Sequence, residues 1–97
     1  YIALYEEGSV EIQRGRRRRR QNLFIQRGYA MAEAGLWEEA IGHFRLAIEV
    51  DVTSPAVPVL LCEIARAYNE LGQPESALAE LEKAQVLAES MQNTSVA

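Results

Sequence analysis

Few side chains in this sequence have the chemistry of a catalytic or metal-binding site. The chain holds one histidine, His43, and one cysteine, Cys62, and neither belongs to a motif with metal-ligand or nucleophile–base spacing. The acidic pair Glu38-Glu39 lies where a helix is expected to begin, and there its charge stabilises the helix dipole. The sequence contains no glycine-rich phosphate loop and no nucleotide-binding fingerprint. We therefore expect no enzymatic activity, no catalytic residue, no cofactor and no metal ion.

The most distinctive segment is a basic block of six arginines. They are Arg14, Arg16, Arg17, Arg18, Arg19 and Arg20. Closely spaced arginines repel one another and attract polyanions, so a nucleic acid, an acidic protein and an anionic membrane surface are candidate ligands. No aromatic residue interleaves with the arginines, as a stacking single-strand binder would need. A solvated spacer without a ligand is the favoured interpretation, and the other three stay open.

The arginine block interrupts a chain that is otherwise acidic. The 97 residues have a formal net charge of −4, but residues 21–97 contain eleven acidic and four basic side chains. A hydrophobic fraction of 48% is enough to form a core, which argues against a wholly disordered chain. No apolar run reaches the ~18 residues that a membrane span needs, and a single cysteine excludes an intrachain disulfide. These features predict a cytoplasmic protein without a membrane span.

Two segments of the chain repeat each other without gaps. Residues 28–41 align with residues 65–78, and Gly72 follows Gly35 by 37 positions. A period of this length is typical of stacked supersecondary units, in which each unit buries its apolar face against the next. Any binding residue is therefore expected to be positioned by such a stack.

Four helices follow from the apolar periodicity and the turn residues. The pattern predicts helices over about 21–34, 37–50, 58–71 and 74–91. Gly35 and Gly72 are placed to close the first and third helices in the left-handed conformation. The predicted fold is all-α, with two antiparallel helical hairpins stacked on each other.

Three groups of residues are expected to pack these helices. Small residues let the helices of each hairpin approach closely, and they are Gly28, Ala40, Ala47, Ala65, Ala77 and Ala84. In the first helix the residues at helical intervals are Leu23, Phe24, Arg27, Ala30, Met31 and Ala34. Larger side chains such as Phe44, Tyr68 and Leu81 are expected to fill the remaining space.

This spacing resembles the tetratricopeptide repeat. The family pattern has a small residue, an aromatic residue and a turn glycine, followed by alanine, an aromatic residue and alanine in the second helix. The first copy supplies Gly28, Met31, Gly35, Ala40, Phe44 and Ala47, and the second supplies Ala65, Tyr68, Gly72, Ala77, Leu81 and Ala84. The resemblance implies a domain over residues 21–97, with repeats at about 21–54 and 58–91. The copies lie 37 residues apart, not 34, with an insertion near Thr53–Val57.

The resemblance also implies a ligand groove lined by the first helix of each repeat. The implied groove residues are Asn22, Ile25, Gln26, Tyr29, Glu33, Val59, Cys62, Glu63, Arg66, Asn69 and Glu70. This mixture suits an extended or helical peptide with apolar and basic residues, whereas Glu63 would repel the terminal carboxylate of a chaperone tail. The implied function is a protein–protein interaction module, a scaffold or adaptor that binds a peptide or partner protein. The alternative is a nucleic-acid-linked regulatory protein that uses Arg14–Arg20.

The last helix is expected to expose apolar side chains. Two repeats are fewer than the ~3 that normally form a stable array, and no further helix follows to cover Leu78, Leu81 and Leu87. An uncovered face of this kind predicts self-association into a homo-oligomer, excision from a longer protein, or a cap formed by residues 1–13. The first two are favoured.

Residues 1–20 form an N-terminal extension whose structure the pattern leaves open. Gly8-Ser9, followed by the alternating Val10 and Ile12, is compatible with a β-hairpin. A preceding helix that packs on the array is the alternative. Because an isolated two-stranded hairpin is only marginally stable in water, a helical or mixed structure is slightly favoured.

Overall fold

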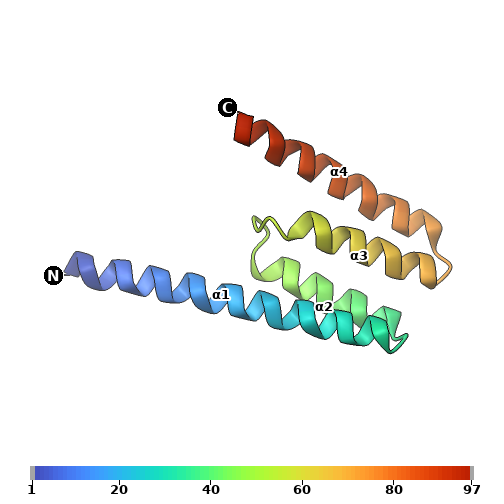
Figure 1. Cartoon of the computed structure of the whole chain (residues 1–97), viewed down its shortest axis with the longest axis horizontal. Coiled ribbons are helices and arrows are strands. Elements are labelled where there is room, and N and C mark those ends of the chain that lie inside the picture. Colours follow the sequence, from blue (N-terminus) through green and yellow to red (C-terminus); the bar gives the residue numbers. More distant parts are fainter. Residues whose placement is uncertain (1, 97) are drawn as a thin grey trace.

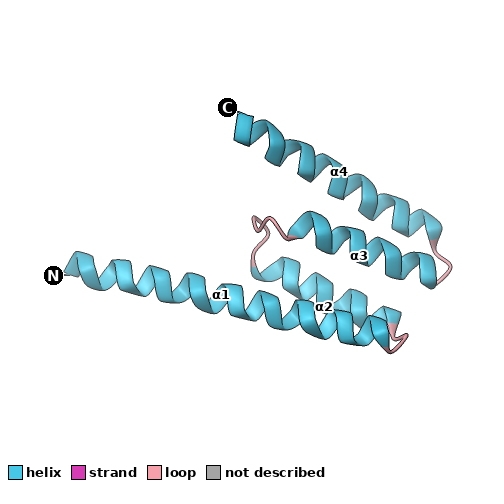
Figure 2. Ribbon diagram, in the orientation of Figure 1, coloured by secondary structure: helices cyan, strands magenta, loops and turns pink. Residues whose placement is uncertain are grey.

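Four helices make up the fold, seen in a computed structural model that describes the backbone of residues 2–96 and the side chains of residues 12–92. The helices are α1 (Ile2–Glu33), α2 (Trp37–Val50), α3 (Val57–Glu70) and α4 (Pro74–Val96), as Figure 1 shows. Within residues 2–96 there is no strand (Figure 2). The prediction of an all-α fold with four helices is confirmed.

The helices pack in chain order as two hairpins. α1 packs on α2, α3 packs on α4, and contacts between α2 and α3 join the hairpins. The result is a flat molecule with Cα extents of 57 × 35 × 14 Å, in which α1 and α4 lie on opposite sides (Figure 1). The N-terminal half of α1 lies far from α4, so residues 2–13 do not form the cap on α4 that was one of the alternatives.

The N-terminal extension is helical. α1 runs without a break from Ile2 to Glu33, through the expected boundary at residue 20, so the β-hairpin alternative for residues 1–20 is wrong over the described residues. Arginine is a good helix former, and adding residues to an existing helix costs far less than starting one. The packed part of α1 therefore supports the arginine block as an additional length of helix.

Both interhelical turns close in the same way. Gly35 and Gly72 have φ values of 77° and 74°. At the first turn the Leu36 N–H donates to the Met31 carbonyl at 2.9 Å and the Gly35 N–H donates to the Ala32 carbonyl at 3.0 Å. The turn at Gly72 repeats both hydrogen bonds at equivalent positions. This is the pattern of a glycine C-cap with paired backbone hydrogen bonds, and it confirms the predicted role of both glycines.

Replacement of either turn glycine by alanine is expected to be destabilising. Gly35→Ala and Gly72→Ala should each lower the free energy of unfolding by about 1–2 kcal/mol, because an L-residue with positive φ crowds its Cβ against a carbonyl. Apart from the glycine's own backbone and its two chain neighbours, a Cβ added at either position meets nothing within 4 Å, so backbone conformation alone sets the cost. Urea unfolding measures the change. The matched control is Gly42→Ala inside α2, also with open space around it, which should stabilise by about 0.5–1 kcal/mol. Loss of stability in the control would contradict this account.

The core lies between the two hairpins around three fully buried side chains, Phe44, Leu60 and Ile64. The predicted small residues are all buried: Gly28, Ala40, Ala47, Ala65, Ala77 and Ala84. Ala40 and Ala47 belong to this core, and Ala84 belongs to a second cluster with Val57 and Leu61. A Cβ added at Gly28 would lie 2.6 Å from Cε1 of Phe44, so the close approach of α1 to α2 depends on the missing side chain. The prediction that small residues permit close helix packing is confirmed.

The buried stripes of α1 and α4 differ from the expected ones. Of the expected α1 residues, Phe24 and Met31 are half-buried and pack against the core. Leu23, Arg27, Ala30 and Ala34 are exposed, and α1 instead buries Gln21 and Gly28. In α4 the exposed fractions of Leu78 and Leu81 are 57% and 42%, so Leu81 does not fill the hairpin as expected. α4 packs on α3 and reaches α2 through the Arg45–Glu80 ion pair. Its buried residues form a narrow stripe, which consists of Ala77, Glu80 and Ala84.

Candidate functional site

The implied groove residues come from two helices, α1 and α3, and the structure brings Tyr29 of α1 close to Glu63 and Arg66 of α3. The ring of Tyr29 on α1 packs edge-on against Phe44 of α2, with 5.3 Å between centroids and 78° between ring planes. The charges of Glu63 and Arg66 on α3 both act on the Tyr29 phenol. The α1–α3 face, defined as the eleven implied groove residues, therefore spans α2 at Tyr29.

This face is open over the described residues. The exposed fractions of Val59 and Tyr29 are 55% and 40%. The other exposed members are Asn22, Gln26, Glu33, Cys62, Arg66, Asn69 and Glu70. Glu63 is half-buried, and Ile25 is also half-buried because it packs against the core. The face thus combines a few apolar contacts with amides and mainly acidic charge.

The pKa of the Tyr29 phenol depends on how α3 lies relative to α1, because Glu63 and Arg66 of α3 act on it. Partial burial raises its pKa above the ordinary 10.0, the negative charge of Glu63 raises it further, and Arg66 opposes the rise. Because its pKa is raised in the folded protein, the Tyr29 phenol ionises at a lower pH in the unfolded chain than in the folded one. The stability that comes from this difference is present below pH 10.0 and is lost as the pH rises through the pKa of the folded protein.

Two charge-neutralising substitutions test this geometry. Glu63→Gln should lower the pKa of Tyr29, and Arg66→Gln should raise it, because each removes one of the two opposing charges. Ultraviolet titration of each variant, with Tyr29→Phe to subtract the other tyrosines, gives the value. A pKa that moves in neither variant would place α3 too far from Tyr29.

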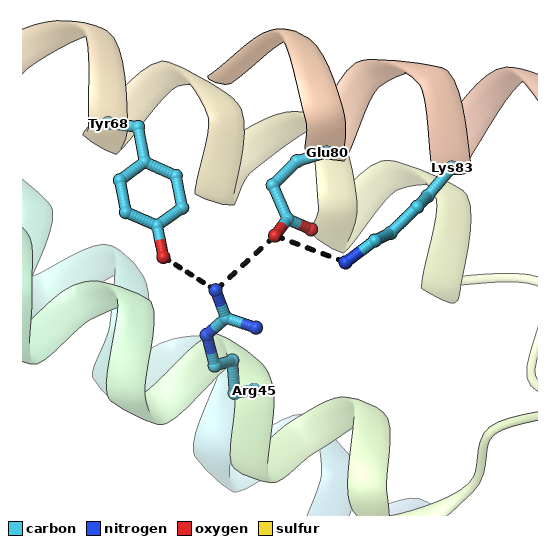
Figure 3. A network of polar contacts seen from close by, with 4 residues as sticks. All are labelled: Arg45, Tyr68, Glu80 and Lys83. Carbon is cyan, nitrogen blue, oxygen red and sulfur yellow. Dashed lines mark hydrogen bonds and ion pairs between the residues drawn. The ribbon is translucent and has the colours of Figure 1, made fainter. Parts of the chain in front are cut away.

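A polar network links α2, α3 and α4 (Figure 3). Arg45 of α2 donates from Nη2 to the Tyr68 hydroxyl of α3 at 2.6 Å and to Oε1 of Glu80 of α4 at 3.3 Å. Lys83 of α4 approaches the same carboxylate oxygen at 3.5 Å. The network therefore ties α2, α3 and α4 together at one point.

Glu80 is the buried member of this network. Its side chain is only 6% exposed, and its second oxygen, Oε2, is buried without a hydrogen-bond donor among the described residues. Burial alone would lower the pKa of Arg45, but the Tyr68 hydrogen bond and the Glu80 charge together raise it above its ordinary value. We assign these residues a structural role, since Glu80 offers almost no surface to a ligand.

The basic block divides into two faces because it is helical. Arg14, Arg17 and Arg18 lie three and four positions apart and share one side of α1, where they line a cleft of about 520 Å³ against the loop over 51–56. The other three, Arg16, Arg19 and Arg20, are exposed and do not line the cleft. In Figure 1, α1 passes the loop that joins α2 and α3.

Gln21 anchors this side of α1, and sequence analysis did not single it out. Its side chain is buried and donates from Nε2 to the carbonyl oxygens of Ala47, at 3.1 Å, and Asp51, at 3.4 Å, at the end of α2. The available signal was spacing, because Gln21, Phe24 and Gly28 recur three and four positions apart.

Asp51 organises the loop beside Gln21. Its Oδ1 accepts hydrogen bonds from the Thr53 hydroxyl at 2.7 Å and the Thr53 N–H at 3.1 Å. These two bonds lower the pKa of Asp51, and the positive charge of Arg17 lowers it further. The loop wall of the cleft is therefore held in place by its own hydrogen bonds.

The predicted self-association face is divided by the structure. Leu78 and Leu81 are exposed, but Leu87 is half-buried and packs against the cluster of Val57, Leu61 and Ala84. Leu78 and Leu87 are nine residues apart, which at about 100° per residue places them on opposite sides of the helix. Leu87 therefore belongs to the α3–α4 contact.

The remaining candidate residues do not assemble into a site. His43 is half-buried with its Nδ1 unpaired, and Cys62 is an exposed free thiol on α3. In the described part of the chain, no three acidic, histidine or cysteine side chains are placed to hold a metal ion. None of the described helices is both long enough and apolar enough to cross a membrane.

No family model, curated protein or solved structure matches the chain.

Proposed function

We propose that this chain is a tetratricopeptide-like protein–protein interaction module that binds a peptide segment of a partner on its α1–α3 face. The observation that carries the proposal is the open, mixed surface formed where Tyr29 and Val59 lie beside Glu63 and Arg66. Packed helices hold these side chains, so little conformational entropy is lost when a ligand binds.

The composition of the face defines the peptide that fits it. Tyr29 and Val59 offer apolar contact, and tyrosine is enriched among the residues that dominate binding energy. Glu33, Glu63 and Glu70 outnumber the single positive charge of Arg66, which favours a peptide with basic residues. The expected ligand is a short segment with one or two apolar anchors flanked by lysine or arginine.

The test is a phage-displayed peptide selection on the full chain, followed by affinity measurement on variants. Val59→Ser should weaken the selected peptides by roughly tenfold, the cost of losing one apolar anchor of about 1–2 kcal/mol. The matched control is Val86→Ser, since Val86 is also an exposed valine, at 67%, but lies on α4, which contributes no residue to this face. Equal weakening by both substitutions, or by neither, would contradict binding on the α1–α3 face.

The exposed apolar side of α4 supports an accompanying proposal, self-association through Leu78 and Leu81. Light scattering across a dilution series should then show a dimer that becomes monomeric in the double variant Leu78→Ser/Leu81→Ser. A wild-type chain that is monomeric at every concentration would exclude this proposal without affecting the first one.

A further inference from the structure

The cleft beside the basic block has a charge that fits a particular ligand. Three guanidinium groups, those of Arg14, Arg17 and Arg18, line it together with the carboxylate of Asp51, which gives a formal charge of +2. Among residues 12–92 none of the three arginines forms an ion pair. The first turn of α3, adjacent to the cleft at Ala56, adds positive potential from its helix dipole.

We propose that this cleft binds a phosphate monoester carried by a peptide, and that the peptide continues along the α1–α3 face. A phosphorylated side chain carries about −1.5 to −2 charges at neutral pH, which matches the +2 of the cleft. Guanidinium groups bind phosphate oxygens in a bidentate manner, so three of them on one helix face can engage a tetrahedral anion from one side.

The cleft and the α1–α3 face are connected through Asn22. This residue lines the cleft and is also the first α1 residue of the face, one position after the buried Gln21. A peptide held by its phosphate at Arg14, Arg17 and Arg18 therefore meets Asn22 before it reaches Tyr29. This continuation rests on the proposed function, whereas phosphate binding in the cleft does not.

A phosphopeptide fits better than a nucleic acid because of the surrounding charge. Beyond the cleft the α1–α3 face carries Glu33, Glu63 and Glu70, which would repel each further phosphate of a polyanion. The cleft offers a local charge of +2, whereas nucleic-acid binding normally uses many basic contacts along a backbone. A ligand with one phosphate followed by neutral or basic residues matches both the positive cleft and the acidic α1–α3 face.

The block itself supplies a matched pair of variants. Arg14→Gln/Arg17→Gln/Arg18→Gln removes the cleft charges, and Arg16→Gln/Arg19→Gln/Arg20→Gln removes the same charge from the outer side of the same helix. Inorganic phosphate is titrated into each full-length chain, with chloride at equal ionic strength as the reference. NMR follows the arginine Nε–H signals and the amide signals of Thr53, Ser54, Ala56 and Val57. Circular dichroism verifies that both variants stay helical.

The cleft variant should lose phosphate affinity by roughly tenfold or more, since hydrogen bonds to charged groups contribute about 1.5–3 kcal/mol each. The variant of the outer arginines should change the phosphate affinity by less than about threefold, because it removes only charges that act on the cleft from a distance. Equal losses in both variants, or no shifts specific to phosphate, would overturn the proposal. A wild-type chain that binds a single-stranded oligonucleotide more tightly than a phosphoserine peptide library would overturn it in favour of nucleic acid.

Two further arms separate this proposal from the proposed function. A phosphoserine peptide library should bind better than its unphosphorylated counterpart, and Val59→Ser should weaken both libraries. If NMR signals shift with phosphate but Val59→Ser has no effect, the cleft is supported as a phosphate site and the α1–α3 face is rejected as a peptide site. An effect of Val59→Ser without a phosphate preference would reject the cleft and retain the face.

Discussion

Replacement of Phe44 by alanine is expected to lower the free energy of unfolding by about 3–5 kcal/mol. Its side chain is 1% exposed at the centre of the core, where it contacts α1 at Gly28 and Tyr29. The cavity left behind cannot be filled from α1, because the residue that faces it, Gly28, has no side chain. Since a domain of this size is stable by only about 5–15 kcal/mol, the change should be plain in urea unfolding.

An exposed control and a double-mutant cycle test the burial of Phe44 and its contact with Gly28. Leu46→Ala, on the same helix with Leu46 42% exposed, should cost much less than Phe44→Ala. Gly28→Ala should cost about 1–3 kcal/mol through overpacking, because the added Cβ would lie 2.6 Å from the fixed Phe44 ring. Phe44→Leu should relieve part of that cost in the double variant, which a double-mutant cycle detects as coupling. Additive effects would contradict the close contact.

Replacement of Arg45 by methionine is expected to lower the free energy of unfolding by about 1–3 kcal/mol. The range reflects the loss of a hydrogen bond to a buried carboxylate. The expected cost is lowered because the Arg45 side chain is 45% exposed, so solvent screens the interaction. Glu80 is left in a 6% exposed position with Lys83 as its remaining ion-pair partner among the described residues. Thermal and urea unfolding both measure the loss.

The source of this effect can be separated from general loss of charge. Arg27→Met, at an exposed position of α1, should change stability by less than about 0.5 kcal/mol. In a Glu80→Leu background the cost of Arg45→Met should largely disappear, since replacing both charges by apolar side chains is often neutral. A cost that persists there would show that Arg45 acts mainly through Tyr68.

Local signals were sufficient to predict where three of the helices begin and both glycine turns lie. α2 matches the expected 37–50, and α3 begins one residue before the expected Pro58. Gly35 and Gly72 have the positive φ that their position before the next helix implied. These features depend on the conformational limits of single residues and on short-range hydrogen bonds. Both are determined by residues that are neighbours in the sequence.

Other features depended on which helix faces which. α1 extends to Ile2 and α4 to Val96, beyond the expected limits, because a helix end without a capping signal is set by the whole structure. The periodicity of α1 allowed several buried faces, and Gly28 against Phe44 selects the one that also buries Gln21. A glutamine carries no apolar signal, so its burial could not be read from hydrophobicity.

The candidate sites show the same division. Sequence by itself determined the arginine block, the small residues, the turn glycines and the helical class, because each follows from residue type and spacing. Only the tertiary structure decided that Arg14, Arg17 and Arg18 line a cleft, that Glu80 is buried beside Arg45, and that Leu87 turns away from Leu78. These outcomes require contacts between residues 23 or more positions apart, and such contacts depend on how the hairpins stack.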